Sequence, residues 1–516
     1  MELKASIFCF FICINCLNGQ KRSSHSRRDR NVLVIIADDA GFETQVYNNT
    51  VCKTPNLNAL AAKSLIFKHA YTSVSSCSPS RSAILTGLPE HQNGMYGLHN
   101  TYHHFESFDE VQSLSKILNN SNIRTGLIGK KHVGPESVYP FEFEYSGEDY
   151  SILQVGRNIT KMKELTQKFF QTQDERPFFL YIGFHDPHRC GHTHPEYGAF
   201  CEKFGNGEAG MGTMPDWKPV LYDPKDVIVP YFVPDTPIVR EELSAQYTTI
   251  SRLDQGIGLV LKELEAAGYS DNTLILYSSD NGIPFPYGRT NAYEPSTMEP
   301  LLVSSPLTKD RNGQTTEAFA SLVDIVPTVL DWFNVTYPSY HIFGKTKDVE
   351  LTGKSLLPLL HEEPTEGFDR AFMSQDLHEI TMFYPMRALR TRTMRLIHNL
   401  NFRMPFPIDQ DFYISGTFQD ILNRTREGQP LHWFSNLQKY YNRPEWELFD
   451  LKEDPQETRN VAMEEQYSAI LKDMKLQLLN WQNVTSDPFI CAPWGVLQDA
   501  GAYKYNHQCM PLDNGL

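Results

Sequence analysis

The sequence predicts an α/β protein built on a mostly parallel β-sheet with helices on both faces, followed by a smaller α+β domain. Unbroken apolar strands separated by helical segments are typical of a parallel sheet that is covered on both sides. With 516 residues, 41% of them apolar, the chain can bury a large core and form two or three domains. Four short apolar runs, each ending at polar residues, are the expected strands: 32–37, 125–129, 178–184 and 273–279.

Three helices are expected around these strands. The first covers 54–64 and has a proline in its first turn, and the second covers 243–267 and stops at Gly268. Proline at the start and glycine after the last residue are ordinary helix-end signals. The third helix is expected over 315–333, with an interruption at Pro327.

The pattern changes after about residue 370. Short strands are expected at 394–398 and 446–451, and a terminal helix at 464–481. We therefore divide the mature chain into a large domain, 31–370, and a smaller C-terminal α+β domain, 371–516.

The first residues indicate entry into the secretory pathway. Residues 5–17 form an apolar run behind Lys4, which is too short to span a bilayer and is typical of a signal peptide, here 1–19. The basic tract 20–30 is expected to be a solvated linker. Because no other run approaches a membrane-spanning length, we expect no membrane association. The net charge of −15 argues against a nucleic-acid binder.

Six cysteines follow the expected signal peptide. In an oxidising compartment we expect near neighbours to pair, Cys190 with Cys201 and Cys491 with Cys509. If Cys77 is chemically converted, Cys52 remains as a buried free thiol. Six Asn-x-Ser/Thr sequons fit a secreted glycoprotein: Asn48, Asn119, Asn158, Asn334, Asn423 and Asn483.

Polar residues at the ends of the four expected strands predict one site, because in open α/β sheets the reactive groups gather beyond the carboxyl ends of the strands. Three of the four strand ends supply Asp38 and Asp39, Lys130 and His132, and Asp280 and Asn281. Carboxylate and amide oxygens select Ca²⁺ or Mg²⁺ over zinc, and three carboxylates with one amide suit Ca²⁺. The alternative is that the acidic pair at 38–39 only caps a helix.

A second motif begins at Cys77. From the residues alone, a cysteine near Arg81 is either a thiolate nucleophile or an inert core thiol. The string CSPSRSAILTG, from Cys77 to Gly87, however, closely resembles the signature of the sulfatase family. The strand-end residues also resemble that family. Finer strings resemble the branch that hydrolyses sulfamates: 74–99, 128–136, 184–192, 279–291 and 405–413.

The resemblance implies an alkaline-phosphatase-like fold, a calcium ion and a formylglycine that the formylglycine-generating enzyme makes from Cys77. An oxygen of the hydrated formylglycine would attack sulfur. Arg81 would hold the hydrated aldehyde, and Lys130, His132 and His188 would surround the sulfuryl group. The implied metal ligands are Asp38, Asp39, Cys77, Asp280 and Asn281. The implied catalytic residues are Cys77, Arg81, Lys130, His132 and His188, and the implied substrate-binding residues are Lys130, His188 and Arg289.

Two points refine this assignment. Many sulfatases have a lysine where this chain has Arg289, and the sulfamate-cleaving branch shares the arginine. A sulfamate releases an amine, which departs poorly unless it is protonated, so a general acid is needed. We expect His188 to be this acid and His132 the base, although the two roles could be exchanged. Lys131 is expected to be solvated or to bind a carboxylate of a neighbouring sugar.

The resemblance implies a lysosomal homodimer that hydrolyses the N-sulfate of the non-reducing-end N-sulfoglucosamine in heparan sulfate. An O-sulfatase acting on a sulfated glycan is the main alternative. A phosphatase or phosphodiesterase on the same sheet would use Ser or Thr and usually two zinc ions, which the oxygen ligands and the Cys77 motif disfavour. A non-catalytic protein that binds sulfated glycans is disfavoured by the acidic surface.

Overall fold

The computed structural model describes residues 30–100, 102–146, 155–191, 194–342 and 348–512. The expected signal peptide, 1–19, and all of the basic tract except Arg30 lie outside these residues. Within the described segments, every helix is too short or too polar to cross a membrane.

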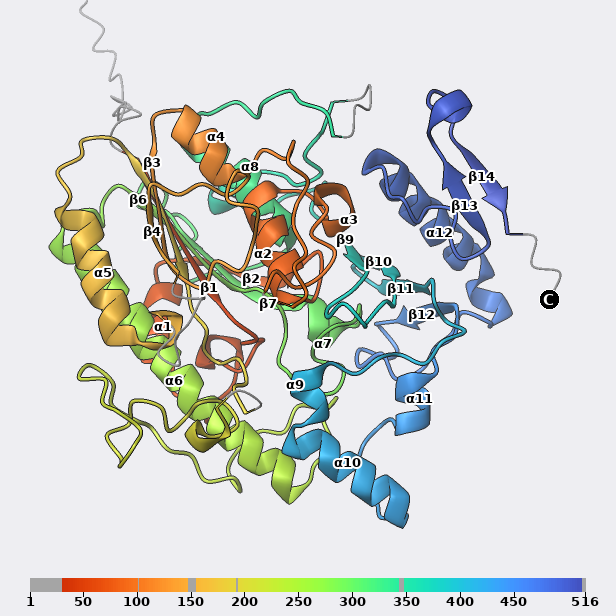
Figure 1. Ribbon diagram of the computed structural model, residues 1–516, viewed down its shortest axis with the longest axis horizontal. Helices are drawn as coiled ribbons and strands as arrows, with labels where there is room; N and C mark the ends of the chain where they lie inside the picture. The colour runs from red at the N-terminus through yellow and green to blue at the C-terminus, as the bar shows by residue number, and fades with distance from the viewer. Residues whose placement is uncertain (1–29, 101, 147–154, 192–193, 343–347, 513–516) are drawn as a thin grey trace, which may run out of the picture.

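An eight-stranded sheet forms the centre of the molecule (Figure 1). Five neighbouring strands, β4 to β6 in the spatial order, are parallel, whereas β7 runs antiparallel to β6 and β2. The four apolar runs are the adjacent strands β3, β5, β1 and β6, which confirms the predicted fold class. In spatial order the strands are β4 (Phe143–Tyr145), β3 (Arg124–Gly129), β5 (Phe178–Gly183), β1 (Asn31–Ala37), β6 (Thr273–Ser279), β7 (Met298–Ser304), β2 (Leu65–Tyr71) and β8 (Thr315–Ser321).

Helices cover both faces of this sheet (Figure 1). Because side chains alternate along a strand, Val32 and Val34 of β1 face one core and Leu33 and Ile35 face the other. The first core lies under α2 (Cys77–Thr86), α4 (Leu114–Asn120) and α8 (Ile325–Phe333). The second lies under α1 (Pro55–Ala61), α5 (Ile159–Gln171) and α6 (Pro237–Ala266).

Two predicted helices differ from the structure. Helix α6 begins at Pro237, earlier than expected, because the Thr236 hydroxyl accepts the Val239 N–H and caps the helix. The helix expected over 315–333 was wrong in its first part. That part is strand β8, and a capping box closed by Asp324 then starts a new turn that leads into α8. Pro327 lies in the first turn of α8, where its missing N–H has no partner to lose.

The C-terminal part contains a four-stranded antiparallel sheet in the order β12-β11-β10-β9. One face packs toward the central sheet, and α12 covers the other (Figure 1). The predicted strands and terminal helix of this region are confirmed, whereas the boundary at residue 370 stays a prediction. The elements are β9 (Arg370–Gln375), β10 (Met386–Thr391), β11 (Met394–Asn399), α9 (Gln410–Tyr413), α10 (Gly416–Glu427), α11 (Leu437–Tyr441), β12 (Trp446–Asp450), α12 (Ser468–Val484), β13 (Gly495–Gln498) and β14 (Gln508–Pro511).

Both predicted disulfides are confirmed. Cys190 is bonded to Cys201, and Cys491 to Cys509. Cys52 is buried and forms no disulfide, as expected.

A buried arginine fastens α12 to the C-terminal sheet. The guanidinium of Arg387, on β10, donates to both carboxylate oxygens of Asp487, at 2.6 and 2.8 Å, just beyond the end of α12. It also donates to Asp376, at 2.8 Å, just after β9. All three side chains are fully buried, and Arg387 is the cation that both carboxylates share.

We expect Arg387→Met to lower the free energy of unfolding by about 3–5 kcal/mol, because two buried carboxylates would lose their partner. Chemical denaturation measures this change. Arg424→Met is the matched control: its ion pair with Asp420 is partly exposed, and its loss should cost about 1 kcal/mol or less. Equal losses in the two variants would contradict the role given to Arg387.

Candidate functional site

The residues at the ends of the central strands meet at one edge of the sheet. Asp38 and Asp39 follow β1, and Asp280 follows β6, the strand next to it. Cys77 is the first residue of α2, so the positive end of that helix also points to this edge. The Cys77 sulfur lies within 4.8 Å of carboxylate oxygens of Asp38 and Asp280. It also lies within 4.8 Å of a carboxylate oxygen of Asp39 and of a ring nitrogen of His188.

Each buried carboxylate of this cluster pairs with a cation, and Arg81 also lies 3.5 Å from Asp38. Lys130 Nζ lies 2.6 Å from Asp38, and Arg81 Nε lies 2.9 Å from Asp280. Arg289 Nη1 lies 2.6 Å from Asp39. Lys130 follows β3, Arg81 lies in α2, and Arg289 lies in the segment after β6. Their ion pairs therefore fix these segments relative to one another.

Burial and the surrounding charges shift the pKa values of this cluster. Burial disfavours the ionised form of Asp38, but Lys130, His188 and Arg81 together hold the pKa of this carboxyl well below its usual range. Burial raises the pKa of Asp280 well above its ordinary value, against the effect of Arg81. Burial also raises the pKa of the Cys77 thiol, so an unmodified Cys77 would be protonated and a poor nucleophile.

The donor set fits a hard divalent cation. The carboxylates contribute several oxygens at one place, and two buried oxygens, Asp38 Oδ1 and Asn281 Oδ1, have no hydrogen-bond partner among the described residues. An orphaned buried oxygen is costly unless a cation or water satisfies it. The oxygens of Asp38, Asp39, Asp280 and Asn281 therefore suit Ca²⁺ better than zinc.

Both predicted histidines lie near Asp38, and burial lowers the pKa of each. His132 follows β3; burial and Lys130 lower its pKa well below the ordinary value, so it is neutral. His188 Nδ1 lies 2.6 Å from the carbonyl oxygen of Arg189 and therefore donates to it. Its Nε2 faces the site, 3.7 Å from Asp39 and 3.6 Å from Asp411.

A buried ion cluster holds the turn that carries His188. The carboxylate of Asp186 receives two hydrogen bonds from Arg252, at 2.6 and 2.7 Å, and one from Arg157, at 2.9 Å. Arg157 also donates to the backbone carbonyl of His188, at 2.9 Å. The position of His188 is thus set by contacts with α6 and with the segment before α5.

Three site residues from the C-terminal part were missed in the sequence. Arg289 Nη2 lies 2.8 Å from His378 Nε2; since a guanidinium only donates, His378 accepts there and its Nδ1–H donates to Ser76 Oγ at 2.8 Å. The carboxylates of Asp409 and Asp411 each lie 3.8 Å from the same Nη2. The string 405–413 contained both aspartates, but nothing in it assigned them a partner.

Lys131 differs from its prediction. Its ammonium group is buried and paired with Glu136 and with Glu144, the latter at 2.8 Å. It is neither solvated nor available to a sugar carboxylate, because one acid from the segment before β4 and one from β4 itself satisfy it.

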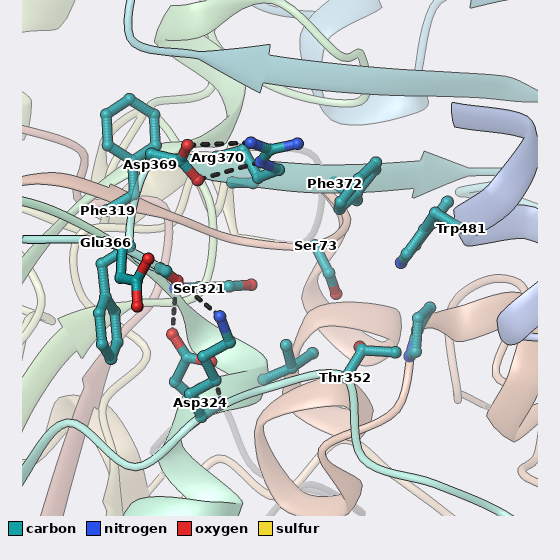
Figure 2. Close-up of a pocket in the computed structure, with 16 residues that line it drawn as sticks. Ser73, Phe319, Ser321, Asp324, Thr352, Glu366, Asp369, Arg370, Phe372 and Trp481 are labelled. Atoms are coloured by element: carbon teal, nitrogen blue, oxygen red, sulfur yellow. Dashed lines mark hydrogen bonds and ion pairs between the residues drawn. The ribbon is translucent and has the colours of Figure 1, made fainter. Parts of the chain in front are cut away.

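A separate cavity of 470 Å³ lies between β8, β9 and α12. Figure 2 shows that two of its carboxylates have partners: Asp369 pairs with Arg370 at 2.9 Å, and Asp324 accepts backbone N–H groups of Ser321 and Lys354. Its lining residues differ from those of the strand-end cluster, so we place the chemistry at the cluster.

Comparisons with known proteins point to one family. The family model "Sulfatase" matches residues 30–335, and the model "N-sulphoglucosamine sulphohydrolase, C-terminal" matches residues 433–484. The chain is 60% identical to the N-sulphoglucosamine sulphohydrolase of Homo sapiens, over 95% of this chain and 96% of that protein. It is 24% identical to an ulvan-active sulfatase of Formosa agariphila, over 94% of this chain and 81% of that protein.

Solved structures share the fold. One, in complex with its substrate D-glucosamine-2-N,6-O-disulfate, matches with a TM-score of 0.61 and 19% identity, over 89% of this chain and 98% of that one. A phosphonate monoester hydrolase from Silicibacter pomeroyi matches with a TM-score of 0.62 and 16% identity, over 93% of this chain and 99% of that one. The family model and the human relative, rather than these distant folds, decide the assignment: this chain is a member of the sulfatase family of hydrolases.

Proposed function

We propose that this protein hydrolyses the N-sulfate of N-sulfoglucosamine at the non-reducing end of heparan sulfate. The observation that carries the proposal is the 60% identity to a human enzyme named for the hydrolysis of N-sulfoglucosamine, over 489 residues. At such identity the substrate pocket, as well as the fold, is expected to be shared. The arginine at position 289, placed against Asp39, supports the sulfamate assignment over that of an O-sulfatase.

We further propose that Cys77 is converted to formylglycine by the formylglycine-generating enzyme and that one Ca²⁺ is bound per chain. The hydrated aldehyde would supply an oxygen nucleophile. An unmodified Cys77 would be a poor nucleophile, because burial raises the pKa of its thiol. Asp38, Asp39, Asp280, Asn281 and the side chain at position 77 would hold the ion, which offsets charge on sulfuryl oxygens.

The side chains around position 77 divide the remaining work. Lys130 and Arg289 pair with the carboxylates beside position 77 and would bind the sulfuryl oxygens. Arg81 is fully buried one helical turn after Cys77. It donates to Asp280 and to the Lys130 carbonyl, at 2.9 and 3.1 Å. It would therefore align the groups around the side chain at position 77, including the expected hydrated aldehyde.

The two histidines suit opposite proton transfers. His132 is neutral and can accept a proton as the base. Burial lowers the pKa of His188, although Asp39 and Asp411 oppose this shift. Its Nε2 faces the site, so in mildly acidic solution its protonated form would donate a proton to the departing nitrogen.

We propose a lysosomal homodimer that arrives through the secretory pathway, as the family resemblance implies. The two disulfides and the exposed sequon residues Asn48, Asn334, Asn423 and Asn483 fit that route. Asn119 is a poor acceptor for a glycan, because its amide group already bonds Thr125 and the Pro140 carbonyl.

Sulfate release from N-sulfoglucosamine and from glucosamine 6-O-sulfate tests the function. We expect the purified protein to release sulfate from the sulfamate at least about 100-fold faster, a difference of about 2.7 kcal/mol in activation free energy. Ion chromatography measures both rates. Preference for the ester would establish the O-sulfatase alternative instead.

The tryptic peptide that contains Cys77 should carry an aldehyde, detected by mass spectrometry and by reaction with a hydrazide. Cys77→Ala should abolish turnover, because no oxygen nucleophile can then form at this position. Cys52→Ala, which removes the other buried unpaired thiol, should retain most activity. A fully active protein with an intact thiol at position 77 would refute the formylglycine proposal.

Arg289→Lys should lower kcat/KM for N-sulfoglucosamine by roughly 100-fold while changing the melting temperature little. One ammonium group cannot bond Asp39 and His378 together as the arginine fork does, so the sulfuryl group loses its alignment. The exposed Arg392 provides the control, and Arg392→Lys should retain wild-type kinetics. A parallel fall in stability and activity would indicate a purely structural role for Arg289.

A further inference from the structure

Two carboxylates from the C-terminal part lie at the outer side of the site. Asp411 Oδ2 is 3.6 Å from His188 Nε2 and 3.8 Å from Arg289 Nη2. Asp409 Oδ1 is 3.8 Å from the same Nη2 and also caps α9 by accepting the Phe412 N–H. The side chain of Asp411 is 14% exposed and lines a cavity of 210 Å³ between α9, α6 and the segment after His188.

Arg289 separates the inner side of the site from this outer side. Its Nη1 binds Asp39 within the fully buried carboxylate cluster, and its Nη2 faces His378 and the two outer carboxylates. A sulfuryl group that is attacked from position 77 lies inside, among Lys130, His188 and Arg289. In-line displacement puts the leaving atom opposite the attacking atom. The leaving atom therefore points outward, toward Asp411.

A carboxylate at this place distinguishes an amine from an alcohol. When sulfur passes from nitrogen to the attacking oxygen, the S–N bond breaks, and nitrogen keeps the electron pair and takes one proton from the general acid. The amine then takes a second proton from water in mildly acidic solution and becomes an ammonium ion. An alcohol released from a sulfate ester stays neutral. A nearby anion in a poorly solvated pocket stabilises only the first product.

We propose that Asp411 determines specificity for nitrogen-linked sulfate by binding the amino group of the leaving sugar, with Asp409 beside it. This inference rests on the proposed function and deepens it. Asp411, rather than Asp409, is the first residue to test, because it lies between His188 and Arg289. In addition, burial raises the pKa of Asp409 to about 6, so below that pH Asp409 is largely uncharged.

The test measures the binding of two sugars to the purified full-length protein at pH 5. Ligand-observed NMR titration gives the two affinities. Glucosamine carries the cationic amine, and N-acetylglucosamine has the same ring with a neutral amide. We expect the wild type to bind glucosamine about tenfold more tightly, and Asp411→Asn to weaken glucosamine binding about tenfold while N-acetylglucosamine binding changes less than about twofold. Asp411→Glu, which keeps the charge, should restore most of the preference.

Glu379→Gln is the matched control, because this carboxylate accepts the Gln410 N–H at the start of the same helix but forms no ion pair with His188 or Arg289 among the described residues. It should bind both sugars as the wild type does. Equal weakening of both sugars in Asp411→Asn, or no preference for glucosamine in the wild type, would overturn the inference. Because binding is measured without turnover, failure to release sulfate from N-sulfoglucosamine would refute the proposed function separately.

Discussion

The crowding of buried negative charge between β1 and β6 is the constraint on which the site depends. Asp38, Asp39 and Asp280 are fully buried at adjacent strand ends, and none of them is tolerable there without a cation. Lys130, Arg81 and Arg289 supply the cations from three different segments. The same charges leave unsatisfied oxygens that suit a divalent ion. Stability and ligand binding are therefore achieved by one arrangement of charges.

The C-terminal part completes this arrangement. Its His378 accepts from Arg289 and donates to Ser76, the residue before Cys77, so one imidazole links the cation to the nucleophile position. The segment after Arg289 is also held from this side, because Glu294 binds Arg390 and Arg395 of the C-terminal sheet. The antiparallel sheet thus contributes to the geometry of the pocket as well as to the stability of the chain.

The fold by itself leaves the chemistry open. A phosphonate monoester hydrolase and several sulfatases share it at low identity, so the reaction is decided by side chains at the strand ends. In this chain those side chains are Cys77 at the start of α2, the oxygen ligands around it, and the outer carboxylates Asp409 and Asp411. The outer pair faces Nη2 of Arg289, whereas Asp39 of the strand-end cluster binds Nη1, and for that reason we connect the pair with the leaving group.

The sequence by itself determined the four central strands, both disulfides and the polar residues after the strands, because apolar runs and the polar residues that end them are local features of the chain. Only the tertiary structure decided that 315–321 is a strand, since its partner β2 lies far away in the sequence. It also decided the ion pairs of Lys131 and the approach of His378, Asp409 and Asp411 to Arg289. The contacts of Arg289 join segments about 90 to 120 residues apart, and they follow from tertiary packing, which no local pattern of residues encodes.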